Sequence, residues 1–524
     1  MLSNLFYQFL LHPLLLHLFD WYFYLFHKLS SIRHFKKKTQ YKNSILNFSN
    51  TFSENYSSSF LPLNLYIGNS TNSKSPVYLC EKSLFQNILI TGTIGTGKTS
   101  SAMYPFTEQF IANPQKFPML ILDVKGNYYL KVKELCEKYH RLDDLVVLEL
   151  NGKFNYNPLH KPNLKSSVLA NRLKNILLLF SPNNSESYWI DKAEQILDAA
   201  IRLCRLYNHY YVTFEEIHKL ITFDNYYKEK IPILRDSFIK NLFSPSEIYD
   251  LLSALTFFEK EFFSLDNRTM SILKSEITRI TNCFVSDYSV FHTFCPSIED
   301  LNFIGFQDAL ASGKIVVLNM NISEYKNLSK IIAAYLKLDF QTEVMNRLAN
   351  HLNQNFSPAI FISDEYSEYC TLSDSQFFSQ SREAKCINIV ATQSYTSLLN
   401  TLHDPYAVQV IIQNLVNKLW FRTDDMFTIE DAQKQIGKED KTKISKSISE
   451  NAKETNYSYL SRSLNSTNSS ISESINTYLQ TDYIYDTNFF TQKLENFSCL
   501  AFLSDGSKII PPQKIQLKPY FKNY

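Results

Sequence analysis

Short apolar runs alternate along this chain with stretches in which apolar residues recur at helical spacing. The strand-like runs fall at 63–67, 77–79, 88–90, 118–126, 145–150, 314–320, 359–365, 387–394, 419–421 and 497–503, and a long helix is expected at about 328–348. Runs that are apolar throughout are typical of strands buried on both faces. The pattern predicts an α/β fold with a mostly parallel sheet and ligands at the carboxyl ends of its strands.

The pattern changes between residues 164 and 266, where strand-like runs are nearly absent. Apolar residues there recur at helical spacing, as in Trp189, Ala193, Ile196, Leu197, Ala200 and Leu203. This spacing predicts an all-α domain inserted into the sheet domain. The sheet domain is then split into a first part at 62–163 and a second part at 267–524.

Residues 441–476 are unusually rich in Ser, Asn and Thr. We expect a loosely ordered loop here, before the last strand-like run at 497–503. The alternative interpretation is that Lys and Ser side chains of this segment face DNA.

The N-terminal segment, residues 1–38, predicts a hydrophobic helix with a basic flank. Residues 5–26 are mostly Leu, Phe, Tyr and Trp, which is long enough to span a bilayer. The cationic flank at 28–38 places the C-terminal side in the cytoplasm, and no signal-peptide cleavage site follows. Pro13, His17 and Asp20 interrupt the run on one helical face, so a helix in the membrane interface, or a soluble one, remains an alternative. Residues 39–61 are polar and indicate a linker.

Composition narrows the function classes only slightly. At 524 residues the chain is long enough for two or three domains, and 44% hydrophobic residues suffice for sizeable cores. A net charge of +2 does not indicate a polybasic surface, so any contact with DNA would have to involve a few Lys and Arg side chains at one place. The eight cysteines are scattered without metal-ligand spacing, which indicates reduced thiols and a cytosolic bulk.

The strongest chemical signal is a phosphate-binding loop of the form GxxxxGK[ST] after the run at 88–90. Its glycines allow backbone N–H groups to face phosphate oxygens, and the helix that follows adds partial positive charge. The lysine reaches the β- and γ-phosphates, and the threonine hydroxyl holds Mg²⁺. The candidate ATP-binding residues are Gly92, Thr93, Ile94, Gly95, Thr96, Gly97, Lys98, Thr99 and Ser100.

A second strand-like run, at 359–363, ends in adjacent acids, Asp364 and Glu365. With the loop this forms a Walker B arrangement, in which Asp364 and Thr99 hold Mg²⁺ and Glu365 deprotonates the attacking water. Gln393 ends the next run and is a candidate sensor of the γ-phosphate, with an ordinary strand-end amide as the alternative. The candidate catalytic set is therefore Lys98, Glu365 and Gln393.

Several short motifs occur in a familiar order around these residues. They are the loop helix with its Pro105, Leu122-Asp123-Val124-Lys125-Gly126, Tyr156-Asn157-Pro158-Leu159, Tyr188-Trp189, Ile362-Ser363-Asp364-Glu365-Tyr366, Ala391-Thr392-Gln393-Ser394, and Asn414 before Leu419-Trp420-Phe421. In this order the chain resembles the type IV coupling proteins of conjugative DNA transfer, the TraG/TraD-like ATPases.

The resemblance implies a RecA-like P-loop NTPase that forms a hexameric motor at the bacterial inner membrane. Such a motor brings DNA and a relaxase to a type IV secretion channel, with single-stranded DNA held in its pore. The resemblance also places a candidate arginine finger at Arg382, which would reach the next subunit. The alternative is that Arg382 pairs with Glu383 or Asp374 on a solvated helix.

Three hypotheses follow from these observations. The first is an ATP-driven coupling motor attached to the inner membrane, with most of the chain in the cytoplasm. The second is a cytoplasmic DNA translocase of the FtsK/HerA type, and the third is a non-hydrolysing membrane scaffold. The intact set of candidate catalytic residues counts against the scaffold. The family commonly carries two transmembrane helices, whereas this chain has at most one such segment, so its membrane attachment is the less secure expectation.

Overall fold

The computed structural model describes residues 63–123, 125–180, 187–349, 356–450, 455–458, 463–466 and 471–521. The predicted N-terminal hydrophobic helix and linker lie outside these residues and stay predictions. Within the described ranges, no helix has the length and apolar character needed to cross a membrane.

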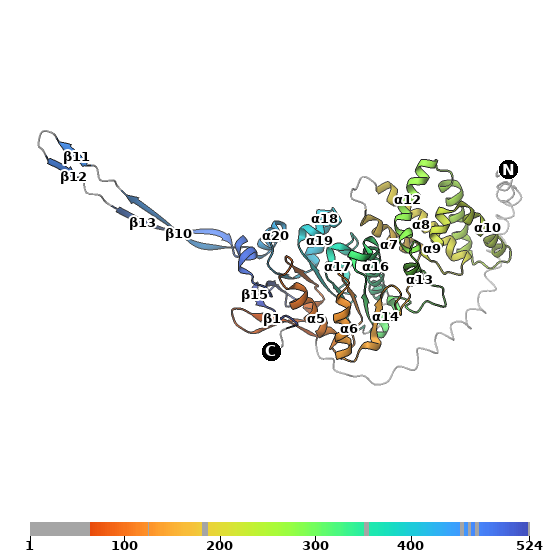
Figure 1. Cartoon of the computed structure of the whole chain (residues 1–524), viewed down its shortest axis with the longest axis horizontal. Helices are drawn as coiled ribbons and strands as arrows, with labels where there is room; N and C mark the ends of the chain where they lie inside the picture. Colours follow the sequence, from red (N-terminus) through yellow and green to blue (C-terminus); the bar gives the residue numbers. More distant parts are fainter. Residues whose placement is uncertain are drawn as a thin grey trace. The chain divides into compact units, whose positions relative to one another are not determined.

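An eleven-stranded sheet organises the described residues, in the order β2-β1-β15-β14-β9-β3-β8-β7-β4-β6-β5 (Figure 1). All pairings from β9 to β5 are parallel, and those from β2 to β9 are antiparallel. The parallel strands are β9 (Asn417–Trp420), β3 (Ile88–Thr91), β8 (Cys386–Thr392), β7 (Ala359–Ser363), β4 (Met119–Leu122), β6 (Ile315–Leu318) and β5 (Leu145–Leu148). The antiparallel edge consists of β1 (Asn64–Ser70), β2 (Pro76–Cys80), β14 (Ser498–Phe502) and β15 (Gln513–Gln516). The predicted α/β fold with a mostly parallel sheet is confirmed.

Helices cover both faces of the parallel strands, which explains why most positions of those strands are apolar, although Asn388 of β8 and Asn417 and Lys418 of β9 are polar. Ile88 and Ile90 of β3 face one core, together with Phe106 of α5 (Tyr104–Ile111). Leu89 between them faces a second core, together with Tyr335 of α16 (Asn327–Ala349). Other helices beside the strands are α4 (Glu81–Leu84), α6 (Tyr128–Lys138), α14 (Phe306–Ser312), α15 (Ile322–Tyr325), α17 (Asp374–Gln380), α18 (Tyr395–Leu402), α19 (Pro405–Asn414) and α20 (Met426–Ile436).

The helical insertion is longer than expected. It contains α7 (Ser166–Leu178), α8 (Ser187–Tyr207), α9 (Phe214–Thr222), α10 (Asp224–Ile239), α11 (Pro245–Thr256), α12 (Asn267–Val285) and α13 (Tyr288–Phe294). The predicted end at residue 266 is therefore too early, because α12 packs against α8 and α9. Leu273, Ile277, Ile280 and Phe284 form the buried stripe of α12, at helical spacing that the sequence already carried.

The Ser-rich segment 441–476 is largely a pair of long strands, and the prediction of a loose loop was wrong there. β10 (Lys438–Glu450) pairs antiparallel with β13 (Ile471–Tyr483) over its whole length, and β11 (Thr455–Ser458) pairs with β12 (Ser463–Ser466). Ile444 and Ile448 alternate with polar neighbours at the period of a strand. The composition of the segment obscured this alternation, because Ser and Asn occupy most positions between its apolar residues.

Candidate active site

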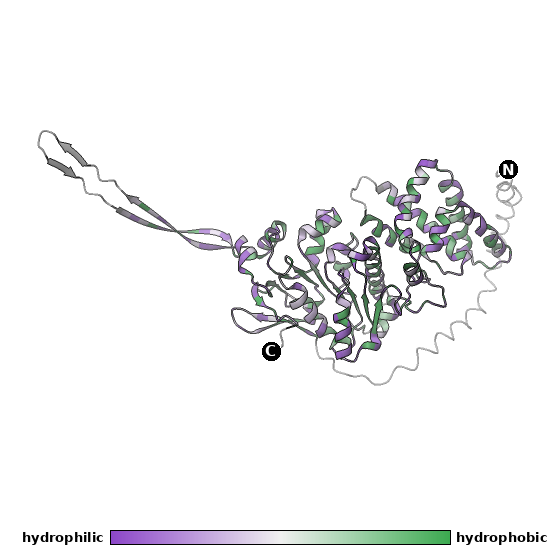
Figure 2. Cartoon of the chain, viewed as in Figure 1, coloured by the Kyte–Doolittle hydropathy of each residue, from purple (hydrophilic) through white to green (hydrophobic). Residues whose placement is uncertain are grey.

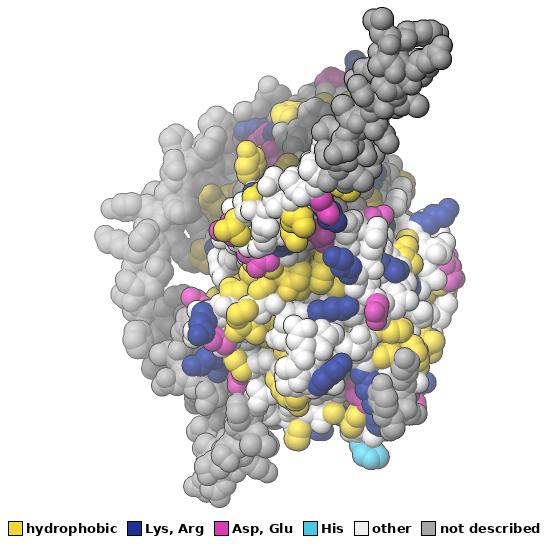
Figure 3. Space-filling model, turned by 90° about the vertical axis from the view of Figure 1, so that its left-hand side faces the viewer, with side chains coloured by type: hydrophobic (Ala, Val, Ile, Leu, Met, Phe, Trp, Pro, Cys, Tyr) yellow, Lys and Arg dark blue, Asp and Glu magenta, His cyan; other side chains and the backbone are white. Residues whose placement is uncertain are grey.

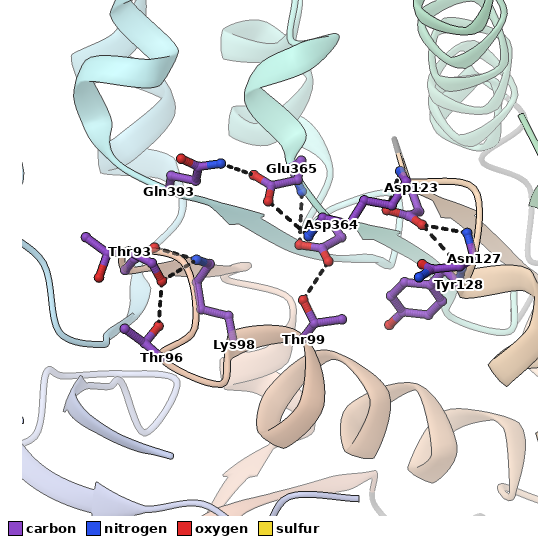
Figure 4. A network of polar contacts seen from close by, with 12 residues as sticks. Thr93, Thr96, Lys98, Thr99, Asp123, Asn127, Tyr128, Asp364, Glu365 and Gln393 are labelled. Atoms are coloured by element: carbon purple, nitrogen blue, oxygen red, sulfur yellow. Dashed lines mark hydrogen bonds and ion pairs between the residues drawn. The ribbon is translucent and has the colours of Figure 1, made fainter. Parts of the chain in front are cut away.

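The predicted site residues meet at the carboxyl edge of the sheet. Strand β8 lies between β3 and β7, in a register that pairs Thr91 with Thr392 and Ser363 with Val390. The loop after β3, Gln393 after β8 and the two acids after β7 therefore emerge side by side (Figure 4). Strand order brings together three segments that are far apart in the sequence.

The phosphate-binding loop is fixed by the segments that follow β9 and precede β14. The backbone N–H of Thr93 donates to the carbonyl of Arg422 at 2.9 Å, and that of Phe497 donates to the carbonyl of Thr96 at 3.0 Å. Gly97 has a φ of +99°, and a Cβ there would lie 2.5 Å from the Phe497 ring. Only glycine fits this position, so the loop keeps its shape against Phe497.

The helix after the loop begins with one wide turn. Residues Lys98–Met103 form a π-helical segment (η1), and α5 follows with Pro105 in its first turn. Proline lacks the N–H that would donate to the preceding turn, and its ring clashes with the carbonyl four residues before it. The winding changes from π- to α-helical directly before Pro105.

Lys98 folds back over the loop and is nearly buried. Its Nζ donates to the carbonyl oxygens of Gly92 and, at 3.2 Å, of Thr93. Burial lowers the pKa of Lys98, and the carboxylates of Glu365 and Asp364 oppose that effect. Phosphate oxygens would offer the amino group stronger acceptors than neutral carbonyls, because both partners would be charged.

Thr99 and Asp364 present two oxygen atoms to one point. The Thr99 Oγ1 donates to Asp364 Oδ2 at 2.7 Å (Figure 4). Burial raises the pKa of Asp364, while Lys125 and the Thr99 hydrogen bond oppose the rise. Among the described residues no group of three or more His, Cys, Asp or Glu side chains can hold a metal. This pair fits Mg²⁺ that takes its remaining ligands from nucleotide phosphates and water.

Glu365 sits between two hydrogen-bond donors. Its Oε1 accepts from Lys125 Nζ at 3.2 Å, and its Oε2 accepts from Gln393 Nε2 at 3.4 Å. Its backbone has a φ of +49°, which is uncommon for a residue with a Cβ and is typical of functional sites. The carboxylate is thus held at the edge where a water molecule could be deprotonated.

Lys125 is the site residue that the sequence interpretation missed. Burial alone would lower its pKa, but the carboxylates of Asp364 and Glu365 outweigh burial and raise the pKa. The turn that carries it is fixed by Asp123, which accepts from the backbone N–H groups of Lys125, Asn127 and Tyr128 at 3.0, 3.3 and 3.2 Å. The available signal in the sequence was a basic residue two positions after an acid at a strand end.

A buried polar network supports the Walker B turn from behind. Lys337 of α16 and Asp374 of α17 form a fully buried ion pair at 2.5 Å. Lys337 also donates to the carbonyl of Tyr369 at 2.8 Å, and the Tyr366 hydroxyl donates to Asp374 at 2.5 Å. Because Tyr366 directly follows Glu365, this network restricts the backbone that aims the carboxylate.

Arg382 lies away from the site of its own chain. It is exposed in the turn before β8, whereas Gln393 follows the end of β8. The seven residues of β8 separate the two positions by roughly 20 Å. Neither alternative pairing is present among the described residues, since Asp374 binds Lys337 and no ion pair joins Arg382 to Glu383. A role for Arg382 in a neighbouring subunit stays a prediction.

Comparison with known proteins supports the resemblance predicted from the sequence. A family model described as the TraM recognition site of TraD and TraG matches residues 358–482. No curated protein matches the chain.

Three solved structures of one bacterial conjugative coupling protein, TrwB, share the fold, each at 11% identity. The unbound form has a TM-score of 0.57 and covers 86% of this chain and 88% of that chain. The complex with ADP and Mg²⁺ has a TM-score of 0.55, with 86% and 89% covered, and the complex with the ATP analogue ADPNP has 0.53, with 83% and 86% covered. The predicted resemblance to type IV coupling proteins is therefore confirmed in the fold and in the segment matched by the family model.

Proposed function

We propose that this chain is an ATP-hydrolysing coupling protein, which moves DNA with its relaxase to a type IV secretion channel in conjugative transfer. One observation carries the proposal: Lys98, Thr99, Asp364, Glu365 and Gln393 meet at one edge of a fold shared with TrwB. The matched family model, whose description names TraD and TraG, favours conjugation over an FtsK/HerA-type role inside the cell.

Each residue has a defined part in hydrolysis. Thr99 and Asp364 would hold Mg²⁺, which would neutralise phosphate charge. Lys98 leaves its carbonyl partners and donates to the β- and γ-phosphates of ATP. Glu365 accepts a proton from water as the water oxygen bonds to the γ-phosphorus and the bond to the β-phosphate oxygen breaks, which yields ADP and phosphate. Each Glu365 oxygen accepts one hydrogen bond and keeps a second lone pair for the water, so Lys125 and Gln393 can hold the carboxylate during this step.

We further propose a homo-hexameric ring in which Arg382 acts on the neighbouring subunit. The exposed side chain, far from its own loop, supports action in trans. An arginine that stabilises the γ-phosphoryl charge contributes roughly 10³ or more in rate.

Mixing variants tests the Arg382 assignment. Arg382→Ala and Lys98→Ala subunits, each inactive alone, should regain part of the ATPase activity when they assemble together. A mixed ring contains interfaces with an intact loop on one side and an intact Arg382 on the other. Near-normal turnover of Arg382→Ala alone, or no recovery in rings of confirmed size, would show the assignment to be wrong.

DNA contacts should be few and local. The net charge is +2, and on the face drawn in Figure 3 basic side chains are scattered among acidic and apolar ones. We therefore place single-stranded DNA in the ring pore, where a few Lys and Arg side chains suffice. Membrane attachment through residues 5–26 at the inner membrane, with the bulk of the chain cytoplasmic, is part of the same proposal.

DNA should stimulate ATP hydrolysis, because a ring closes its shared sites best around a strand. Stimulation should decline sharply as salt rises, since phosphate contacts release counterions. The measurement is steady-state phosphate release with and without single-stranded DNA across a salt series, with Glu365→Gln as the hydrolysis-deficient control. Absence of stimulation by any nucleic acid at low salt would contradict the proposal and favour a scaffold.

A further inference from the structure

One face of the hairpin formed by β10 and β13 carries four large apolar side chains. Its register pairs Thr442 with Leu479, Ile444 with Thr477, Lys446 with Ile475, and Ile448 with Glu473. Directly paired residues of an antiparallel ladder share a face, and alternate residues of one strand do so as well. Ile444, Ile448, Ile475 and Leu479 therefore lie together on one face, called the apolar face below, which also carries Thr442, Lys446, Glu473 and Thr477. The opposite face carries Lys443, Ser445, Ser447, Asn476, Tyr478 and Gln480.

This apolar face is open to solvent in the single chain. The exposed fractions are 70% for Ile444, 63% for Ile448, 60% for Ile475 and 71% for Leu479. Figure 2 shows hydrophilic and hydrophobic residues mixed along the described part of the hairpin. No other described element pairs with either strand, so both outer edges also have unpaired backbone groups. A two-stranded ribbon of this kind is at best marginally stable in water without a partner.

The two strands differ in charge. β10 carries four lysines against three acidic residues, and its stretch at 441–449 contains Lys441, Lys443 and Lys446 with no acid. β13 carries Glu473 and Asp482 and no basic residue. One outer edge of the hairpin is therefore positive and the other is negative.

We propose that this hairpin docks on the same hairpin of a second copy of the chain. The positive β10 edge of one copy lies beside the negative β13 edge of the next, because pairing like edges would bring lysines or acids together. Such head-to-tail contacts repeat around a ring. They also place the apolar faces on one side of a continuing sheet, whose twist and curvature turn the faces toward one another. The inference rests on the proposed ring assembly and not on ATP hydrolysis.

Substitution of the apolar face tests the contact. The variant carries Ile444→Ser, Ile448→Ser, Ile475→Ser and Leu479→Ser, and the control carries Ser445→Thr, Ser447→Thr and Asn476→Thr on the other face. We expect self-association, measured by light scattering over a concentration series, to weaken more than about a hundredfold in the variant only. Unchanged association would overturn the proposal. Nucleotide binding by the variant reports that it is folded, and Lys98→Ala should keep normal association, so failure of this inference is distinct from failure of the ATPase proposal.

Charge exchange tests the direction of pairing. One chain carries Lys441→Glu, Lys443→Glu and Lys446→Glu, and the other carries Glu473→Lys and Asp482→Lys. Each alone should associate weakly, and an equal mixture should recover, since opposite edges meet only between unlike chains. The ion pairs inside one hairpin, Lys446 with Glu473 and Lys443 with Asp482, are lost in both chains and cannot return on mixing. Normal association of the separate chains, or no recovery on mixing, would overturn the head-to-tail contact.

Discussion

Lys98→Ala should lower the ATP hydrolysis rate by about 10³-fold or more, because Lys98 is the single basic residue of the loop at 92–100 and its charge would oppose that of the β- and γ-phosphates. The fold should persist, since the hydrogen bonds of the Lys98 amino group go to two backbone carbonyls. Glu365 keeps its ion pair with Lys125 when Lys98 is removed. Phosphate release and the thermal unfolding midpoint measure the two effects separately.

Lys133→Ala is a matched control, since Lys133 lies exposed on α6 away from the loop. It should leave both the rate and the unfolding midpoint unchanged. Wild-type turnover in Lys98→Ala would contradict the assignment of the loop, and a collapse of the unfolding midpoint would contradict its description as a cradle outside the core.

Glu365→Gln should bind Mg²⁺–ATP with near-normal affinity but hydrolyse it about 10² to 10⁴ times more slowly. The amide keeps the shape of the side chain and can still bond Lys125 and Gln393, but it cannot take a proton from water. Binding of a fluorescent ATP analogue gives the affinity, and single-turnover hydrolysis gives the chemical step.

Glu368→Gln makes the same chemical change three residues away. Glu368 is half-buried and pairs with Lys330, away from Gln393 and Lys125, so this control should hydrolyse ATP at the wild-type rate. If Glu365→Gln also keeps the wild-type rate, another group activates the water.

The parallel core of the sheet was predictable because β3, β4, β6, β7 and β8 are buried on both faces and so are apolar at most positions, with Asn388 of β8 as the polar residue inside a strand. The phosphate-binding loop and the acids Asp364 and Glu365 indicated the site, because each follows directly after such an apolar strand. The short strand β15 gave no signal, as its residues QKIQ hold a single apolar side chain that pairing with β1 and β14 buries.

Other features depended on the order of the strands, which local pattern does not encode. Lys125 gained its role only when β4 was placed beside β7 and brought it to Glu365. Phe497 likewise approaches Gly97 because β14 joins the sheet next to β9. Strand β8 runs from the turn that holds Arg382 to Gln393, so Arg382 lies at the opposite end of the strand from the phosphate-binding loop of its own chain. Residue spacing in the sequence alone could not show this.

The central claim is that ATP hydrolysis by this chain moves DNA, and displacement of streptavidin from a biotinylated single strand tests it most directly. With ATP and Mg²⁺ the wild-type chain should displace streptavidin from one end of the strand, while ADP, or ATP with Glu365→Gln, should give none. Hydrolysis of ATP that is stimulated by the strand, yet displaces streptavidin from neither end, would contradict the account.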